Sequence, residues 1–283
     1  MTAATIKLYL PQGEAKELRT AEISNWTGKA VAAPRIQLDQ ILAREEVEKA
    51  GVYILVGSDV ETGKPLAYIG EAEVIGDRLR QHKAKEFWNS VIVFVSKDEN
   101  LTKAHIRYLE GRLISEAQKV GRFALDNGQN GGSKLPESDR ADMEVFLVRI
   151  KQLLSVLGCD ILTPLSGASS QASQQGMVFC RSNGAEASGK RTAEGFVVFK
   201  DSTAALIERP SAIKHHPFVV VLRKQLLADG SLTPSDGFLR FTKDVLFSSP
   251  SAGAAVIHGG GANGWKEWKS KEGKPLKEIE SDV

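Results

Sequence analysis

The sequence predicts an α+β protein built from two small domains, and three observations support this. The chain has 283 residues, well above the roughly 150 of a typical domain. Hydrophobic patterns typical of strands alternate along it with patterns typical of helices. Residues 166–176 are almost all small and polar, which is typical of a flexible linker. We therefore expect a second α+β domain over residues 177–283.

Residues 1–50 are expected to form an N-terminal extension that packs on the domain following it. Residues 6–10 alternate between apolar and polar side chains, which predicts a strand, and residues 21–26 form a second extended stretch. Apolar residues at helical spacing predict a helix over residues 38–47.

Residues 51–165 are expected to form the first domain. Apolar runs at 51–56 and 66–70 flank turn residues and predict a β-hairpin. The patterns that follow predict a helix from residue 76 or 77 to 87, a buried strand at 90–96 and a helix at 101–120. A loop at 126–136 and a further strongly patterned segment at 143–157 come next. The first part of this domain is thus a small layer of hairpin, helix, strand and helix.

The second domain is expected to mix strands and helices. Strands are predicted at 177–180 and 195–199, and helices around 222–227 and 252–257. Ser249 and Pro250 suit the start of the last of these helices. Residues 265–269 are expected to close the ordered part of the chain.

Composition and charge exclude several classes of protein. The net charge of +2 is too small to drive nucleic-acid binding by itself, so a local basic patch would be required. No apolar run approaches the roughly 18 residues of a membrane span, and the first ten residues do not form a secretory signal. Two cysteines are too few for a disulfide framework. We expect a cytoplasmic protein with no membrane partner.

Tyr53 and Tyr68 are expected near the same end of the two hairpin strands. Each has a glycine two residues away, Gly51 or Gly70, where a backbone can approach a ligand closely. A cross-strand aromatic pair also stabilises a hairpin without any catalytic role. Taken alone, the pair favours the structural interpretation.

The predicted helix after the hairpin is basic. Arg78 and His82 lie four residues apart on one face, with Lys85 one turn further and Arg80 and Lys83 nearby. A solvated helix face explains such a run. An arginine fork and a histidine that titrates near neutral pH also suit phosphate chemistry.

Glu110 lies within the apolar stripe of the helix predicted at 101–120. A carboxylate at such a position costs several kcal/mol unless it is paired or bound to a cation. A buried arginine partner and a Mg²⁺ ion are both consistent with this position.

These residues together resemble the GIY-YIG endonuclease family. Gly51-Val52-Tyr53 and Tyr68-Ile69-Gly70 resemble the two halves of its signature, with valine at one usual isoleucine position. The family arginine commonly follows the second tyrosine by ten residues, as Arg78 does, and His82 matches the His-or-Tyr position one turn later. Glu110 matches the metal-binding glutamate, and Asn127, or less closely Asn130, matches the later asparagine. The resemblance covers residues 51–127.

The resemblance implies a hydrolytic mechanism and assigns six catalytic residues, namely Tyr53, Tyr68, Arg78, His82, Glu110 and Asn127. Glu110 would hold Mg²⁺ or Mn²⁺, and Arg78 would stabilise charge on the phosphorus. Tyr53 is the implied general base, and His82 is its rival because the pKa of a phenol near 10 suits a base poorly. Glu71 stands where excision-repair members carry lysine, which speaks against identity with that repair subunit.

The second domain resembles an uncharacterised domain that accompanies some bacterial GIY-YIG nucleases. The resemblance rests on residues 184–187, 194–198, 247–251 and 263–268. Trp265 and Trp268, with Lys266 between them and Lys269 after them, suit a surface that stacks on nucleic-acid bases and contacts phosphates. Tryptophans more commonly pack in a core, and this interpretation is favoured over binding.

Two hypotheses about function follow. The first is a metal-dependent endonuclease that cleaves DNA, with Arg80, Lys83, Lys85, Trp265 and Lys266 as further DNA contacts. The resemblance alone suggests a role in restriction or phage defence, with an accessory domain that binds nucleic acid or a protein. The second is an inactive nucleic-acid-binding or scaffold protein that retains the nuclease fold. The number of subunits is not predicted.

Overall fold

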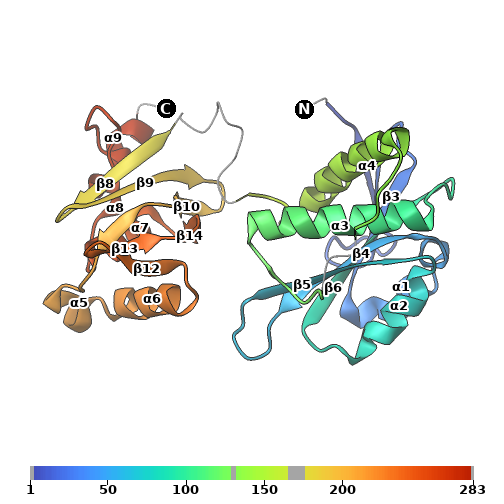
Figure 1. Cartoon of the computed structure of the whole chain (residues 1–283), viewed down its shortest axis with the longest axis horizontal. Helices are drawn as coiled ribbons and strands as arrows, with labels where there is room; N and C mark the ends of the chain where they lie inside the picture. Colours follow the sequence, from blue (N-terminus) through green and yellow to red (C-terminus); the bar gives the residue numbers. More distant parts are fainter. Residues whose placement is uncertain (1–2, 129–131, 165–175, 282–283) are drawn as a thin grey trace. The chain divides into compact units, whose positions relative to one another are not determined.

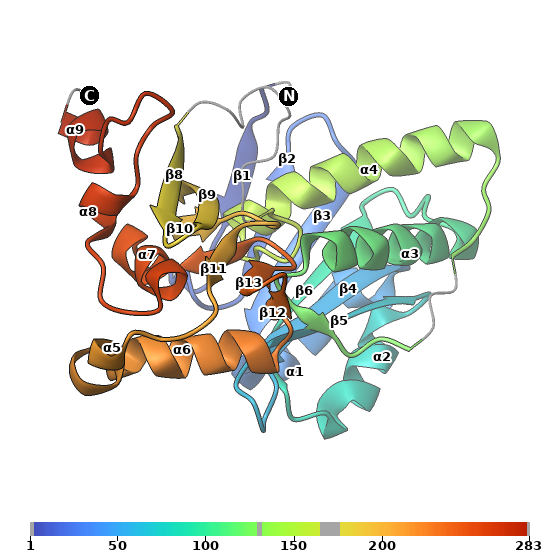
Figure 2. The ribbon, with the colours of Figure 1, turned by 60° about the vertical axis from the view of Figure 1, so that its left-hand side comes forward.

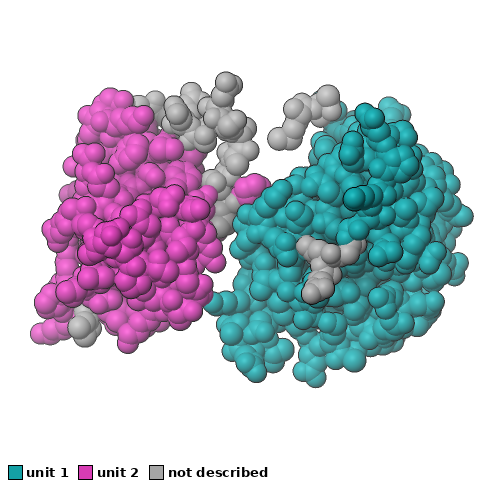
Figure 3. Space-filling model, viewed as in Figure 1, with its two compact units in different colours: residues 1–163 teal, residues 164–283 magenta. Residues whose placement is uncertain are grey.

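A computed structural model describes residues 3–128, 132–164 and 176–281 of the chain. The chain divides into two compact units, Met1–Thr163 (unit 1) and Pro164–Val283 (unit 2), which Figure 3 shows in two colours. Of the expected linker, only Gly176 belongs to the described residues. Asn130, the weaker match to the family asparagine, lies outside them.

Unit 1 contains a seven-stranded sheet in the order β1-β2-β3-β6-β4-β5-β7. Its strands are antiparallel neighbours except for β5 and β7, which are parallel. Their bounds are β1 Ile6–Tyr9, β2 Arg19–Ile23, β3 Gly28–Pro34, β4 Gly51–Ser58, β5 Pro65–Ala72, β6 Trp88–Ser96 and β7 Ala124–Leu125. β4 and β5 form the expected hairpin, and β6 is the expected buried strand.

The N-terminal segment belongs to this sheet, whereas we expected it to pack on the first domain as a separate extension. β3 was not predicted from the sequence, yet it pairs along its whole length with β6. It joins β1 and β2 to the hairpin strands, so the layer is larger than the expected hairpin, helix, strand and helix.

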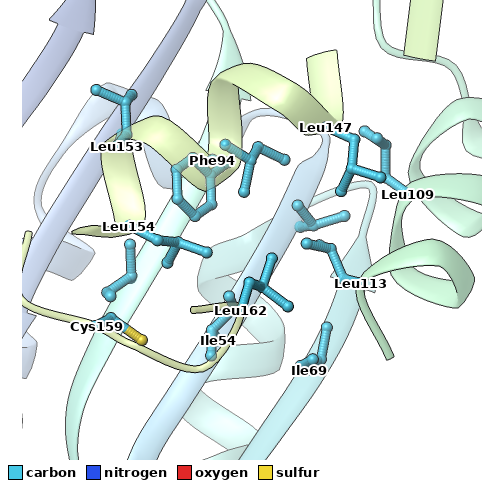
Figure 4. Packing of buried hydrophobic residues seen from close by; sticks show 14 of the residues in the cluster. Ile54, Ile69, Phe94, Leu109, Leu113, Leu147, Leu153, Leu154, Cys159 and Leu162 are labelled. Carbon is cyan, nitrogen blue, oxygen red and sulfur yellow. The ribbon is translucent and has the colours of Figure 1, made fainter. Parts of the chain in front are cut away.

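Helices cover both faces of the sheet (Figure 1). α3 (Lys103–Val120) and α4 (Glu137–Val156) pack on one face, while α1 (Leu38–Leu42) and α2 (Ile75–Gln81) pack on the other. Figure 4 shows Ile54 and Ile69 of the sheet facing Leu109 and Leu113 of α3. α3 begins at a Thr102 capping box and ends at Gly121, whose φ of 67° suits the left-handed conformation.

Two expected helices are shorter than the sequence suggested. The helix at 38–47 is α1 followed by a separate 3₁₀ turn at Glu45–Glu48. The helix predicted to reach residue 87 is α2, which ends at Gln81, followed by a 3₁₀ turn at His82–Ala84. There the Trp88 indole donates a hydrogen bond to the His82 carbonyl at 3.0 Å, so a tertiary contact takes the place of a helical one.

Unit 2 contains a four-stranded sheet, β14-β10-β9-β8, and a three-stranded sheet, β11-β13-β12. The bounds are β8 Met177–Ser182, β9 Ala185–Thr192, β10 Gly195–Val198, β11 Thr203–Ala205, β12 Leu232–Ser235, β13 Phe238–Phe241 and β14 Val245–Phe247. Within each sheet, neighbouring strands are antiparallel.

The helices of unit 2 are α5 Pro210–His215, α6 Pro217–Ala228, α7 Pro250–His258, α8 Gly264–Glu267 and α9 Leu276–Ser281. α7 contacts β8 and β10, and α6 contacts β12 (Figure 2). α9 follows residues 265–269, so the expectation that those residues close the ordered part was wrong. Its buried Leu276 packs in the same core as Trp268.

The protein therefore has the α+β class expected from the sequence. Among the described residues, no helix is both long enough and apolar enough to cross a membrane.

A buried ion cluster ties β3 to the 3₁₀ turn before β4. The Glu46 carboxylate is almost fully buried and binds Lys29 at 2.7 Å and Arg44 at 2.8 Å. Burial alone would raise the pKa of Glu46, but the hydrogen bonds from Arg44 and Lys29 outweigh it and lower the pKa to about 2.

We predict that Glu46→Gln lowers the free energy of unfolding by about 1.5–3 kcal/mol at pH 7, the usual range for a hydrogen bond to a charged group. Because the pKa in the folded protein lies below the ordinary 4.5, this contribution is present above pH 4.5 and is lost as the pH falls toward 2. Denaturant unfolding between pH 7 and pH 3 would measure it. The exposed neighbour Glu45→Gln is the control, and equal losses for the two variants at pH 7 would contradict the prediction.

Candidate active site

The two signature tyrosines lie on one face of the β4–β5 hairpin. Tyr53 pairs with Gly70 and Leu55 pairs with Tyr68, so all four side-chain positions face the same side of the sheet. The two phenol rings lie 6.1 Å apart between centroids. The tyrosines are thus diagonal neighbours across the strands.

The glycines of the signature are required by close approaches. A Cβ atom on Gly70 would lie 2.4 Å from the Tyr53 hydroxyl, so the phenol rests against the backbone of β5. A Cβ atom on Gly51 would lie 2.2 Å from the Phe94 carbonyl oxygen of β6. Only glycine leaves room at these two positions.

His82 completes an aromatic cluster with the tyrosines. Its Nε2 atom forms a 2.9 Å hydrogen bond with the Tyr53 hydroxyl, and its ring lies 4.8 Å from that of Tyr68. Buried Ile75 and Leu79 anchor α2 in the same core cluster as Tyr53, which places the end of α2 above the hairpin. Three rings from three segments therefore meet on this face.

Burial sets the protonation states of this cluster. Tyr53 is fully buried, and desolvation, with the neighbouring Tyr68, holds its pKa well above the ordinary value of 10. Desolvation also lowers the pKa of His82 below 6.5, and the charges of Lys85 and Arg78 add to this effect. At neutral pH the phenol keeps its proton and the imidazole is uncharged.

Arg78 brings a cation to the same face. The charge of Arg78 acts on both Tyr53 and His82, lowering the pKa of each. Its guanidinium donates to the Gln81 side chain at 2.8 Å, and no carboxylate lies within salt-bridge distance in the described ranges. The exposed arginine is therefore available to an anionic ligand.

Glu110 approaches from the opposite face of the sheet, on α3. It is half-buried, and desolvation raises its pKa, as does the nearby carboxylate of Glu71. Among the residues that the structure describes, no lysine or arginine nitrogen lies within 4.0 Å of its carboxylate, so the buried arginine partner considered from the sequence is not observed. A hydrogen bond from the Glu71 backbone holds it.

The two faces meet at the edge of β5. β7 pairs with this edge at Leu66 and Ala67. The side-chain amide of Asn127 continues the pairing at Ile69. It donates a hydrogen bond to the Ile69 carbonyl at 2.6 Å and accepts one from the Ile69 amide at 3.1 Å. Asn127 thus positions the strand next to Gly70. The Glu110 charge adds slightly to the raised pKa of Tyr53, so the carboxylate acts on this cluster from the other face.

The carboxylates at the edge suit a divalent cation. Glu110 is desolvated and lies beside a second carboxylate, Glu71, and both features favour binding of a positive ion. No group of three metal-ligating side chains exists among the described residues. Mg²⁺ is commonly held by one or two carboxylates and completes its shell with water and phosphate, so Glu110 with its neighbour fits this ion.

The other basic residues of this region are ion-paired. Arg80 binds Asp77 at 2.8 Å on the same helix. Lys83 binds Asp39 at 3.3 Å. Both pairs are exposed, as expected of a solvated helix face, and contribute little to stability.

Two residues at the site were not given a catalytic role from the sequence, where Asp126 was expected to serve loop structure. Asp126 forms an ion pair with Lys85, whose ammonium lies 5.1 Å from the centre of the Tyr68 ring. Glu71 binds Lys103 at 2.9 Å beside Glu110. The alternation of side chains along β5 could have indicated the position of Glu71 from the sequence. It places Glu71 on the same face of the sheet as Ile69, under α3.

In unit 2 the two tryptophans do not form the paired stacking surface considered from the sequence. Trp268 is fully buried, lies 4.5 Å from the Phe196 ring and donates to the Pro250 carbonyl at 2.9 Å. Trp265 is half-buried, and the Cζ atom of the Arg191 guanidinium lies 5.4 Å from the centre of the Trp265 ring. Lys266 is exposed beside them.

Comparison with known proteins identifies only the second unit. A family described as "Domain of unknown function (DUF4357)" matches residues 178–280, less than half of the chain. This agrees with the uncharacterised C-terminal domain expected from the sequence. No GIY-YIG family match was found for unit 1, so the nuclease activity remains a proposal. No curated protein matches the chain. No solved structure matches it.

We predict that Gly70→Ala displaces the Tyr53 phenol and breaks its hydrogen bond to His82, because the new methyl group would lie 2.4 Å from the hydroxyl and clash with it. The free energy of unfolding should fall by about 1–3 kcal/mol, as for other overpacked cores. Denaturant unfolding and the NMR shifts of the His82 ring would measure both effects. Gly128→Ala, which has open space around its Cβ position, is the control. Unchanged His82 shifts in Gly70→Ala would contradict the prediction.

Proposed function

We propose that unit 1 is a metal-dependent phosphodiesterase that hydrolyses DNA. One observation supports this most strongly: an unpaired arginine, an uncharged histidine and a desolvated carboxylate gather around one strand edge. Phosphodiester hydrolysis needs these three functions, which are charge stabilisation, a proton acceptor and a cation ligand.

Arg78 and Glu110 would act on the phosphate from opposite faces of the sheet. Arg78 would bind its non-bridging oxygens and stabilise the charge that develops on them during attack. Glu110 would hold Mg²⁺ or Mn²⁺, with Glu71 beside it. The bound ion would polarise the phosphate and stabilise the leaving oxygen.

Burial favours His82 over Tyr53 as the group that accepts a proton from the attacking water. A base must reach water and must be unprotonated, and Tyr53 is fully buried with a raised pKa. His82 is half-exposed and its pKa lies below 6.5. The geometry thus supports the rival of the base that the family resemblance implies.

Tyr53 would then position His82. If the imidazole carries its hydrogen on Nε2, it donates to the Tyr53 oxygen, and Nδ1 is left with a free lone pair for the proton of water. The phenol would fix the ring orientation in the way that a second group orients the histidine of other hydrolases. Tyr68, half-exposed beside both rings, would contact the phosphate or the water.

We predict that purified protein nicks supercoiled plasmid in the presence of Mg²⁺ or Mn²⁺, and that EDTA abolishes the nicking. Glu110→Gln should lower the rate by at least about 100-fold, because the cation loses its charged ligand. Glu116→Gln on the same helix, which removes a carboxylate paired with Lys151, is the matched control. Retention of plasmid in gel shifts without any metal-dependent cleavage would support the inactive binding protein instead.

We predict that His82→Ala lowers the cleavage rate by about 100- to 10,000-fold, the usual range for loss of a general base. Tyr53→Phe should have a smaller effect, because it removes the orienting hydrogen bond but leaves the base. In the parent protein the rate should rise with pH through the pKa of His82, below 6.5, and then level off, because only the uncharged ring accepts a proton. Rates measured from pH 5 to 9 test this, and a larger loss in Tyr53→Phe than in His82→Ala would restore Tyr53 as the base.

A further inference from the structure

Unit 2 contains two hollows that share the edge strand β8. Phe179 and Arg181 are two residues apart on this strand, so both point to the face opposite the buried Cys180. The first hollow, about 450 Å³, extends from them to residues 267–273, and the second, about 570 Å³, extends toward β9, β11 and β13. Both are large enough for a nucleotide-sized ligand.

The first hollow is basic, and its cations are largely unpaired. Arg181, Lys269 and Lys271 line it together with one carboxylate, Glu267, which lies 3.5 Å from His258. Neither lysine has a carboxylate within salt-bridge distance in the described part of the chain. Arg181 binds Glu186 at 3.0 Å, but both side chains are mostly exposed, so this pair is weak. The hollow therefore favours an anion.

The backbone holds these lysines in place. Lys269 pairs with Phe179 through two hydrogen bonds of 2.7 and 2.9 Å, which places the two side chains next to each other on the same face. Lys271 lies in the tight turn closed by the Ser270–Lys274 and Ser270–Gly273 hydrogen bonds, where Gly273 has a φ of 86°. The backbone at both lysines is therefore ordered before binding, and only their side chains have still to be ordered.

The second hollow offers a surface for a base. Phe179 lines both hollows, and Phe238 lies across the second one, packed against Gly184. The charged groups there largely balance, since Arg240 lies 3.8 Å from Asp236. A ring that stacks on phenylalanine would meet polar neighbours such as Thr203 at its edge.

We propose that this face of unit 2 binds single-stranded nucleic acid, with phosphates on Lys269, Lys271 and Arg181 and a base stacked on Phe179. Cations without a close carboxylate beside a partly exposed aromatic ring, as Phe179 is, are the combination that single-strand binding uses. Duplex DNA keeps its bases inside the stack, so it could use the cations but not the ring. The site shares Lys269 with the surface around Trp265 considered from the sequence, but it stacks the base on Phe179 instead of a tryptophan. It does not depend on nuclease activity in unit 1.

The test measures binding of the full-length protein to a dye-labelled 12-nucleotide oligo(dT). Fluorescence anisotropy reports the affinity at a series of salt concentrations, with EDTA present. The double variant Lys269→Ser/Lys271→Ser should lower the slope of log affinity against log salt by about 1.4, which corresponds to two phosphate contacts at about 0.7 each. Phe179→Leu should weaken binding roughly tenfold with little change in this slope. Replacing thymines with 5-iodouracil should give photo-crosslinks at Phe179 that the double variant loses.

Lys224→Ser/Lys243→Ser is the matched control, because both lysines are exposed in unit 2 and line neither hollow. If the two double variants lost affinity and salt dependence equally, binding would rest on non-specific charge and the proposal would be overturned. Crosslinks confined to unit 1 would overturn it as well. Equal competition by dTMP would assign the hollow to a free nucleotide and overturn the assignment to a strand. Equal affinity for duplex of the same length would exclude stacking on Phe179.

Discussion

The contact between the Tyr53 phenol and the backbone at Gly70 is the constraint on which the candidate active site depends. A Cβ atom at residue 70 would lie only 2.4 Å from the hydroxyl, which forms a 2.9 Å hydrogen bond with His82 Nε2. The same contact keeps water from the phenol, which raises its pKa and leaves the less buried imidazole as the group able to accept a proton. One missing side chain thus sets both the geometry and the protonation of the cluster.

The sheet separates Arg78 from the Glu110 carboxylate, although Lys103 stands with Glu71 on the α3 face. Arg78 and His82 stand on the α2 face, whereas Glu71 and Glu110 stand on the α3 face. Only the edge of β5 is reached from both, and Asn127 keeps that edge open by pairing with one residue of it. A phosphate at the edge could therefore meet the Arg78 guanidinium on one side and a cation held by Glu110 on the other, without Arg78 neutralising Glu110.

The sequence predicted the parts of the fold whose signals are local. The hairpin, α3 and the spacing from Tyr68 to Arg78 and His82 each depend on a short period or a fixed offset. It did not predict β3, because its alanines have low strand propensity and its partner β6 lies some sixty residues further on. The end of α2 depends on the Trp88 indole, and the role of Asn127 depends on a two-residue strand. Such contacts leave no periodic signal in the sequence.

The ion pairing of the basic residues differs between the two units, and this difference favours phosphate chemistry in unit 1 and nucleic-acid binding in unit 2. Around the candidate active site, Arg80, Lys83 and Lys85 are each engaged by an aspartate, so Arg78 is the cation most available for a phosphate. One such contact can stabilise a reacting phosphate but adds little salt-dependent affinity for a long polyanion. In unit 2, no carboxylate of the described residues lies within salt-bridge distance of Lys269 or Lys271, and Lys269 stands beside Phe179. With a net charge of only +2, affinity for nucleic acid must come from local groups of this kind, which the fold places outside the unit proposed to do the chemistry.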